Sequence, residues 1–267
     1  MTTFSTSATS VASTAQAARL LSERRRTGTQ GERLPESCRP GDLAAALAIQ
    51  TLVTAELGAT VRAWKCGTPS EGKLVVAPIY TITRAEQGHC QVWNRAGQVR
   101  VEPELAFVLA QDLPARTEPY SDEEIDAAIG SVHLALELID SRYTSPGSVS
   151  FAENLADGLL NQGLFIGPQL SAMELSEIHA GTREHVCIDV HTEAQATKQF
   201  KGRHPDADPR IPLYWLVNYL RSQGQALLAG QAVITGSYAG SFEVPIDATT
   251  KIVFGELGLL QVRFSAR

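Results

Sequence analysis

The sequence contains little cysteine and no dense positive charge beyond one short arginine run. Its four cysteines are scattered and form no Cys-x-x-Cys pair: Cys38, Cys66, Cys90 and Cys187. A chain of 267 residues does not need a disulfide framework, so this usage indicates a reducing compartment, and we expect a cytoplasmic protein. The formal net charge of −6 argues against a nucleic-acid partner, because phosphate binding normally needs a basic patch.

Long apolar runs are absent as well. No run approaches the ~18 residues that span a bilayer, so we expect no membrane partner. The N-terminal stretch MTTFSTSATSVASTAQ lacks the charged start and the apolar block of a secretory signal, and we expect its first dozen or so residues to be loose. Its Ser-rich, acid-poor composition leaves an organelle transit peptide as the alternative.

The chain begins with helical spacing. Residues 14–26 predict a helix capped by Thr14, and residues 42–57 predict a second helix with a wide apolar face. From about residue 59 the sequence consists of short runs rich in Val, Ile, Tyr and Trp, separated by glycine or proline. These runs predict strands. We therefore expect an N-terminal helical segment over residues 1–58 and a β-rich domain over residues 59–267.

Two further helices are expected among the strands. Ser121 and Glu124 form a capping-box pattern at the start of a helix that continues to Val132, and residues 211–224 predict another helix. Residues 144–170 are expected to be mostly loop. Together these patterns predict an α+β protein dominated by β-structure.

The stretch RVEPELAF places two carboxylates two residues apart inside an apolar run. Residues two apart in a strand share a face, so Glu102 and Glu104 should point the same way. Glu137 is a further lone carboxylate, within the apolar stretch LALELI. Three glutamates in apolar strands form a suitable oxygen-ligand set for a hard divalent cation such as Mg²⁺ or Mn²⁺. The alternative is that each glutamate pairs with a nearby arginine, such as Arg100 or Arg142.

Two other side chains have more than one interpretation. Lys65 follows Trp64 in a predicted strand, where it is either a surface lysine with its stem along apolar surface or a functional cation. Ser237, in the stretch TGSY, lacks the Gly-x-Ser-x-Gly elbow of a nucleophilic serine. Its Gly-Ser turn either offers hydrogen-bond donors to a carboxylate or is a turn without chemistry.

Several motifs, taken in order, resemble one enzyme family. RVEPELAFVLAQDL followed by ALELIDSRY resembles the 2-oxopent-4-enoate hydratase and 4-oxalocrotonate decarboxylase group of the fumarylacetoacetate hydrolase superfamily. The stretches AARLLSERR, DLAAALAIQTLV, AWKCG, FAEN, PLYWLVNYL and GQAVITGS resemble further motifs of that group in the same order. The resemblance covers most of the chain. It implies a β-dominated mixed-sheet roll or sandwich with N-terminal helices, in which residues 59–267 form the catalytic domain.

The resemblance also implies a set of site residues. Glu102, Glu104 and Glu137 correspond to the ligands of a divalent metal, Mg²⁺ or Mn²⁺. The implied catalytic residues are Lys65, Glu71 and Asn154, and the implied substrate-binding residues are Gly236 and Ser237. In this interpretation Lys65 is a charge partner for the substrate carboxylate or enolate, or a proton carrier if burial lowers its pKa.

The chain departs from the family pattern between Lys65 and the glutamate pair. The stretch CGTPSEGKL is shorter than the family's pocket-forming loop, and Glu71 aligns only loosely with a family aspartate. A short loop predicts a more open site and a larger or different substrate than pentadienoate. Water exclusion would then come from the segment around Asn154, from the 198–210 loop with His204, or from a neighbouring subunit.

The resemblance implies a metal-dependent hydratase that acts on a small 2-hydroxy-dienoic or 2-oxo-enoic acid in the catabolism of aromatic compounds. It further implies a homo-oligomer, with a second enzyme of the pathway as a further partner. The alternatives are a decarboxylase of 2-oxo-enedioates, a C–C bond hydrolase of the same superfamily, and a non-catalytic subunit that binds a metabolite or a partner. The hydrolases need a histidine and a glutamate near the start of the domain, and no histidine precedes His89. The complete set of three glutamates argues against a non-catalytic subunit.

Overall fold

The computed structural model describes residues 11–171, 185–193 and 195–267. They fall into two compact units. The first comprises the residues up to Thr60 with 69–77 and 141–161, and the second comprises 61–68, 78–140 and 162–267. The helical unit thus includes two later segments besides the expected N-terminal one. None of the described helices has the length and hydropathy that a membrane span requires.

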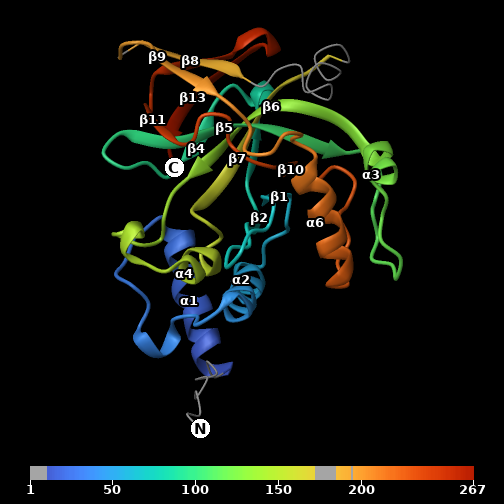
Figure 1. The fold of residues 1–267 in the computed structure, drawn as a ribbon. Coiled ribbons are helices and arrows are strands. Elements are labelled where there is room, and N and C mark those ends of the chain that lie inside the picture. The colour runs from blue at the N-terminus through green and yellow to red at the C-terminus, as the bar shows by residue number, and fades with distance from the viewer. Residues whose placement is uncertain (1–10, 172–184, 194) are drawn as a thin grey trace. The chain divides into compact units, whose positions relative to one another are not determined.

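The first unit is a small helical cluster. Its two long helices correspond to the predicted ones: α2 is capped by Asp42, which accepts a hydrogen bond from the Ala45 amide at 2.8 Å, and it ends at Gly58 in the left-handed conformation. Thr14, expected to be a cap, lies inside α1, so that prediction is wrong. The helices of this unit (Figure 1) are α1 (Val11–Thr27), η1 (Glu36–Cys38), α2 (Leu43–Leu57), η3 (Pro146–Ser148) and α4 (Phe151–Ala156).

One buried and one half-exposed ion pair hold the segment 141–161 within this unit. Arg142 donates to Asp157 at 2.6 Å, and both side chains are almost completely buried. Arg33 donates to the buried carboxylate of Glu153 at 2.6 Å. The expectation that residues 144–170 are mostly loop is therefore wrong, because they contain α4 and, in the second unit, most of a strand, β7 (Asn161–Gln169).

The second unit contains two β-sheets and two α-helices. The larger sheet has the strand order β2-β1-β10-β5-β6-β7-β3, with β11 also paired to β5, and the smaller has the order β4-β13-β12-β8-β9. The remaining strands are β1 (Ala63–Cys66), β2 (Val76–Ile79), β3 (Ile82–Arg84), β4 (Cys90–Val92), β5 (Gln98–Leu109), β6 (Ile129–Ile139), β8 (Val186–Thr192), β9 (Lys198–Gly202), β10 (Ala232–Ile234), β11 (Phe242–Pro245), β12 (Thr249–Phe254) and β13 (Leu259–Ala266). The helices are α3 (Asp122–Ala128) and α6 (Ile211–Ser222), with the short turns η2 (Ala85–Gln87) and η4 (Gly255–Leu257).

The larger sheet curls until its two edges meet. Its edge strands β2 and β3 are separated in the chain by only Tyr80 and Thr81, so the same stretch of chain forms both edges. The inward face carries small and branched apolar side chains that form one buried cluster: Ala63, Ile79, Ala106, Ala135, Leu164, Ile166, Ala232 and Ile234. Alanines at four of these positions allow strands to curl tightly around a narrow interior.

The outward face of the larger sheet packs on the smaller sheet. A Cβ atom added to Gly167 of β7 would lie 2.8 Å from Leu260 Cδ1 of the smaller sheet and 2.9 Å from the carbonyl oxygen of Leu134. Cβ atoms do not approach other atoms this closely, so a side chain at position 167 would clash, and glycine is required there. The result is the β-dominated roll and sandwich that the sequence predicted. Figure 1 shows β5 and β6 as long curved neighbours in this arrangement.

The predicted capping box at α3 is confirmed. Ser121 accepts from the Glu124 amide, and the Glu124 carboxylate accepts from the Ser121 amide. The helix nevertheless ends at Ala128 and not at Val132. From Ile129 onward the chain pairs with β5, and Val132 lies opposite Phe107. Sheet pairing therefore overrides a helical pattern of only moderate length.

Replacement of Ile166 with alanine tests the interior of the rolled sheet. Ile166 is 1% exposed, so the variant should lose about 2–5 kcal/mol of unfolding free energy through lost burial and the cavity left behind. Urea unfolding followed by circular dichroism measures this. The matched control is Leu259→Ala, since Leu259 is 46% exposed and its loss should change stability by less than about 1 kcal/mol. Equal effects in the two variants would contradict the buried interior.

Candidate metal centre

Strand β5 changes partners on one side at its middle. Residues 98–101 pair with β11, and residues 106–108 pair with β10. Between these two ladders, Pro103 has no amide proton to donate, and its carbonyl accepts a hydrogen bond from the Tyr238 amide at 2.9 Å. Proline is tolerated in a central strand where no ladder bond is required of its nitrogen. The partner change therefore leaves room for side-chain chemistry at residues 102–105.

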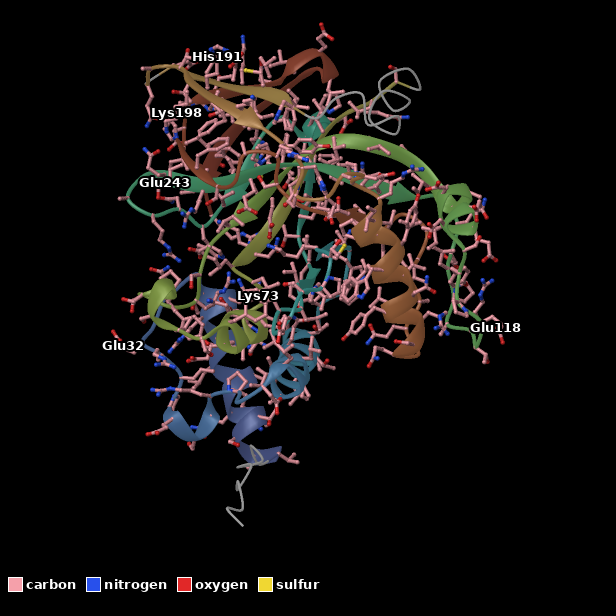
Figure 2. The ribbon with its side chains drawn as sticks, viewed as in Figure 1. Glu32, Lys73, Glu118, His191, Lys198 and Glu243 are labelled. Carbon is pink, nitrogen blue, oxygen red and sulfur yellow. The ribbon has the colours of Figure 1, made fainter. Side chains whose placement is uncertain are left out.

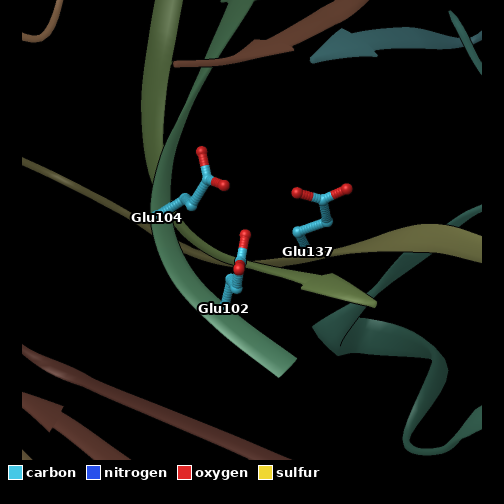
Figure 3. Close-up of side chains that lie close together, drawn as sticks. All are labelled: Glu102, Glu104 and Glu137. Atoms are coloured by element: carbon cyan, nitrogen blue, oxygen red, sulfur yellow. The ribbon is translucent and has the colours of Figure 1, made fainter. Parts of the chain in front are cut away.

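Three carboxylates converge at this position (Figure 3). Glu102 and Glu104 lie on β5, and Glu137 of β6 is the direct cross-strand partner of Glu102. One oxygen from each carboxylate lies within 4.8 Å of the others. Glu104 is 3% exposed and Glu137 is 0% exposed, whereas Glu118 and Glu243 lie on the surface (Figure 2). Like charges placed directly opposite each other in a sheet are destabilising, so this arrangement calls for a positive partner.

Lys65 of β1 supplies one positive charge. Its Nζ donates to both oxygens of Glu137 at 2.7 Å, and only 13% of its side chain is exposed. The alternative of a surface lysine is therefore wrong. The alternative of glutamate–arginine pairs also fails for Arg142, whose partner is Asp157. Burial lowers the pKa of Lys65, but the charges of Glu137, Glu102 and Glu104 outweigh it, so the pKa is raised. With no metal bound, Lys65 is thus held as a cation by the three glutamates.

The remaining negative charge is only partly compensated. Burial and then the charge of Glu137 raise the pKa of Glu102 to about 7. The same two causes raise the pKa of Glu104 well above its ordinary value, although the Gly236 amide opposes them with a hydrogen bond to Glu104 Oε2 at 2.7 Å. One ammonium in direct contact does not neutralise three carboxylates, of which Glu104 and Glu137 are buried and Glu102 is half-buried.

The three carboxylates fit a divalent cation. Two oxygens bound to one Mg²⁺ lie at most about 4.2 Å apart, and two bound to Ca²⁺ at most about 5.2 Å apart. The limit of 4.8 Å between these oxygens lies within the Ca²⁺ value and exceeds the Mg²⁺ value, so the carboxylates would have to move closer together to bind Mg²⁺. Two added positive charges would also balance the two carboxylates that Lys65 does not contact. The donor set is of the hard, all-oxygen type that such ions prefer.

The other predicted site residues have different placements. Gly236 and Ser237 follow β10 beside the glutamates, but the Gly236 amide is engaged by Glu104, and the Ser237 hydroxyl donates to the carbonyls of Pro103 and Gly240. Glu71, in an exposed turn, and Asn154, in α4, belong to the first unit. The roles of these four residues remain predictions.

His204 was not predicted as a site residue. The sequence analysis named it only as part of the 198–210 loop that could exclude water from the site. His204 is 6% exposed, and its Nε2 lies 3.3 Å from the Thr235 hydroxyl, next to Gly236. The signal that could have found it is weak: a lone histidine between Arg203 and Pro205 in an irregular segment.

Comparison with known proteins agrees with this fold and its motifs. No profile of a protein family matches the chain. A 2-keto-4-pentenoate hydratase of Paraburkholderia phymatum is 24% identical over 250 residues, which cover 87% of this chain and 90% of that protein. The 4-oxalocrotonate decarboxylase of Pseudomonas putida G7, complexed with magnesium and adipate, matches with a TM-score of 0.72 at 15% identity, over 96% of this chain and 98% of the other.

A more distant structure shares the same architecture. A protein of the fumarylacetoacetate hydrolase family from Yersinia pestis CO92 matches with a TM-score of 0.51 at 17% identity, over 76% of this chain and 91% of the other. The fold is thus that of the fumarylacetoacetate hydrolase family. Together with the curated hydratase, these likenesses support placement of the chain in the fumarylacetoacetate hydrolase superfamily, as its motifs indicated.

The raised pKa of Glu102 predicts a pH dependence of stability in the metal-free protein. The folded state binds this proton more tightly than the unfolded chain does, from the ordinary value of 4.5 up to about 7. The contribution to stability is therefore complete below about pH 4.5 and is lost as the pH rises through about 7. With EDTA present, the unfolding free energy of the wild type relative to Glu102→Gln should fall by on the order of 1–3 kcal/mol across this window. Parallel pH profiles for the two proteins would show that Glu102 has an ordinary pKa.

Proposed function

We propose that this protein is a divalent-metal-dependent enzyme that adds water to a small 2-hydroxy-dienoic or 2-oxo-enoic acid. One observation carries the proposal: three glutamates with oxygens within 4.8 Å of one another lie in an apolar setting with one lysine in contact. A bound Mg²⁺ or Mn²⁺ would be held by Glu102, Glu104 and Glu137. It would supply a Lewis acid for the carboxylate and the C2 oxygen of such an acid.

The residues around the carboxylates support this chemistry. Lys65 is held charged beside the ligands, where its ammonium can attract an acidic substrate and stabilise negative charge that develops at C2. The Gly236 amide fixes Glu104 in one orientation. The apolar interior of the rolled sheet adjoins the site through Ala106 and Ala135, on the same faces of β5 and β6 as the glutamates, and excludes water from that side.

Decarboxylation of a 2-oxo-enedioate is the second candidate. It needs the same stabilisation of an enolate, so the described site serves both reactions. Support comes from the 4-oxalocrotonate decarboxylase, whose structure holds magnesium and adipate, a dicarboxylate. The named hydratase, matched in sequence over 250 residues, favours hydration as the first candidate. A C–C hydrolase and a non-catalytic subunit have weaker support, since no histidine precedes His89 and the glutamate set is complete.

The proposal extends to partners and to the substrate's size. The shortened stretch around Glu71 favours a substrate larger than pentadienoate, and Glu71 and Asn154 are proposed as further catalytic residues. We also propose a homo-oligomer, because a neighbouring subunit would help to exclude water from an open site. A second enzyme of the pathway is proposed as a further partner. Aromatic catabolism is the proposed context.

The function is tested with purified protein, Mg²⁺ or Mn²⁺, and acids of increasing length, both 2-hydroxy-dienoates and 2-oxo-enedioates. Loss of ultraviolet absorbance without gas identifies hydration, whereas CO₂ release identifies decarboxylation. Glu104→Gln should reduce metal-dependent turnover by at least about 100-fold, because it removes a charged ligand from the cation. Its circular dichroism should match the wild type. Unchanged turnover in this variant would place the reaction elsewhere in the molecule.

Lys65→Met should lower kcat by about 100-fold or more while the protein still binds metal, because the variant loses a fixed positive charge next to the substrate. Lys198→Met is the control, since Lys198 lies on β9 at the surface (Figure 2) and donates only to the Glu243 carbonyl among the described contacts. Steady-state kinetics of both variants provide the measurement. A loss shared equally by the control would argue against a specific role of Lys65.

A further inference from the structure

The amide that holds Glu104 is itself held by a separate segment. Gly236 has a φ of +144°, and its amide donates to Glu104 Oε2 at 2.7 Å. On its other side the segment His204–Pro205 packs against it: an added Cβ would lie 3.1 Å from Pro205 Cγ and 3.2 Å from His204 Nε2. The direction of this amide therefore depends on what occupies the space behind Gly236.

His204 is fixed in this space from two sides. Nδ1 lies 3.1 Å from the Asp206 amide nitrogen and 3.2 Å from the Asp206 carbonyl oxygen. Nε2 lies 3.3 Å from the Thr235 hydroxyl, which can donate or accept and therefore pairs with either tautomer of the ring. Thr235 immediately precedes Gly236, so the ring contacts the Thr235 hydroxyl and occupies the space where a side chain at position 236 would lie. Burial lowers the pKa of His204, which favours the neutral form of the ring.

The surrounding segment is also anchored. The Arg203 amide donates to the Tyr238 carbonyl at 2.7 Å, and the His204 ring packs edge-on against the Tyr238 ring at 5.4 Å between centroids. Asp206 accepts from the Thr68 hydroxyl at 2.8 Å, three residues after Lys65 in the chain. The segment thus connects the end of β1 with the turn after β10, the two places that supply Lys65 and the Gly236 amide to the carboxylates.

We propose that His204 is a positioning residue for Glu104, which acts by fixing the direction of the Gly236 amide. The inference rests on the proposed metal site but not on the identity of the reaction. Without the ring, Gly236 gains freedom, and the Glu104 carboxylate loses the donor that holds it in place for a cation. Groups that orient a metal ligand in this way typically contribute 10- to 100-fold to metal affinity.

The first measurement needs no metal and no substrate. The sequence contains two Thr–Gly pairs, at Gly28 and Gly236, so carbonyl-labelled threonine with ¹⁵N-glycine yields two amide signals, and Thr27→Ser identifies the other one. The short bond to Glu104 Oε2, 2.7 Å from the Gly236 nitrogen, should place the Gly236 amide proton downfield. His204→Ala should move it upfield, and His204→Gln, which retains a polar group at the position of Nε2, should restore it in part.

The second measurement is Mn²⁺ affinity by calorimetry and electron paramagnetic resonance. We expect His204→Ala to bind Mn²⁺ about 10- to 100-fold more weakly than wild type, and His204→Gln to bind with intermediate affinity. His133→Ala is the matched control, because His133 is a half-buried histidine of β6 that contacts Gly167 and Ser131 and not the Gly236 turn. It should leave the Gly236 signal and the Mn²⁺ affinity unchanged.

The outcomes separate this proposal from the proposed reaction. If His204→Ala keeps the wild-type amide signal and affinity, the proposal is overturned, whatever the enzyme catalyses. If His204→Ala does not fold, Thr235→Val replaces it, since it removes the hydroxyl partner of Nε2 at nearly constant shape. This variant is read by Mn²⁺ affinity, because it lacks the threonine label before Gly236, and a wild-type affinity also overturns the proposal. Failure of every substrate to react, with the amide and affinity effects present, would reject the reaction and leave the role of His204 intact.

Discussion

Repulsion between Glu102, Glu104 and Glu137 is the constraint on which this molecule's chemistry depends. Three carboxylates in a setting of low polarity oppose folding, and the raised pKa values of Glu102 and Glu104 are the sign of that opposition. The fold tolerates it because β5 and β6 are paired along ten residues of β5, from Arg100 to Leu109, so the backbone cannot separate the charges. Lys65 and the Gly236 amide offset part of the cost. Because one lysine and one amide balance only part of the charge of three carboxylates, the site is suited to binding a cation.

The position of this site follows from an interruption in the sheet. A continuous central strand would have both sides occupied by backbone ladders, and its side chains would face only packed neighbours. Here β11 and β10 share one side of β5 and leave a gap between them, which the turn after β10 fills with the amides of Gly236 and Tyr238. Pro103, which looks out of place in a strand, lies in this gap.

Features that depend on a few neighbouring residues could be predicted from the sequence, whereas contacts between residues far apart in the chain could not. The two-residue period of a strand was enough to place Glu102 and Glu104 on one face, and the capping box at Ser121 needed only its own four residues. That Glu137 lies opposite Glu102, or that Lys65 contacts Glu137, depends on strand register, which no local pattern encodes. The strand β7 was missed because it is buried on both faces over most of its length and shows no alternation. His204 was undervalued because its partners, Thr235 and Asp206, come together only in the folded chain.

The parallel pairing of β1 with β10 sets an order of assembly. Ala63 lies opposite Ala232 and Lys65 opposite Ile234. The strand that carries Lys65 therefore cannot pair until residues 232–234, near the other end of the chain, are available. Pairings of such high sequence separation form late, because the entropy of closing so long a loop must be overcome first. During synthesis the three glutamates are therefore present on a nascent hairpin of β5 and β6 well before the strand that completes their surroundings leaves the ribosome. The site matures last, and a chain truncated before Gly236 would carry the acidic residues without the amide that orients them.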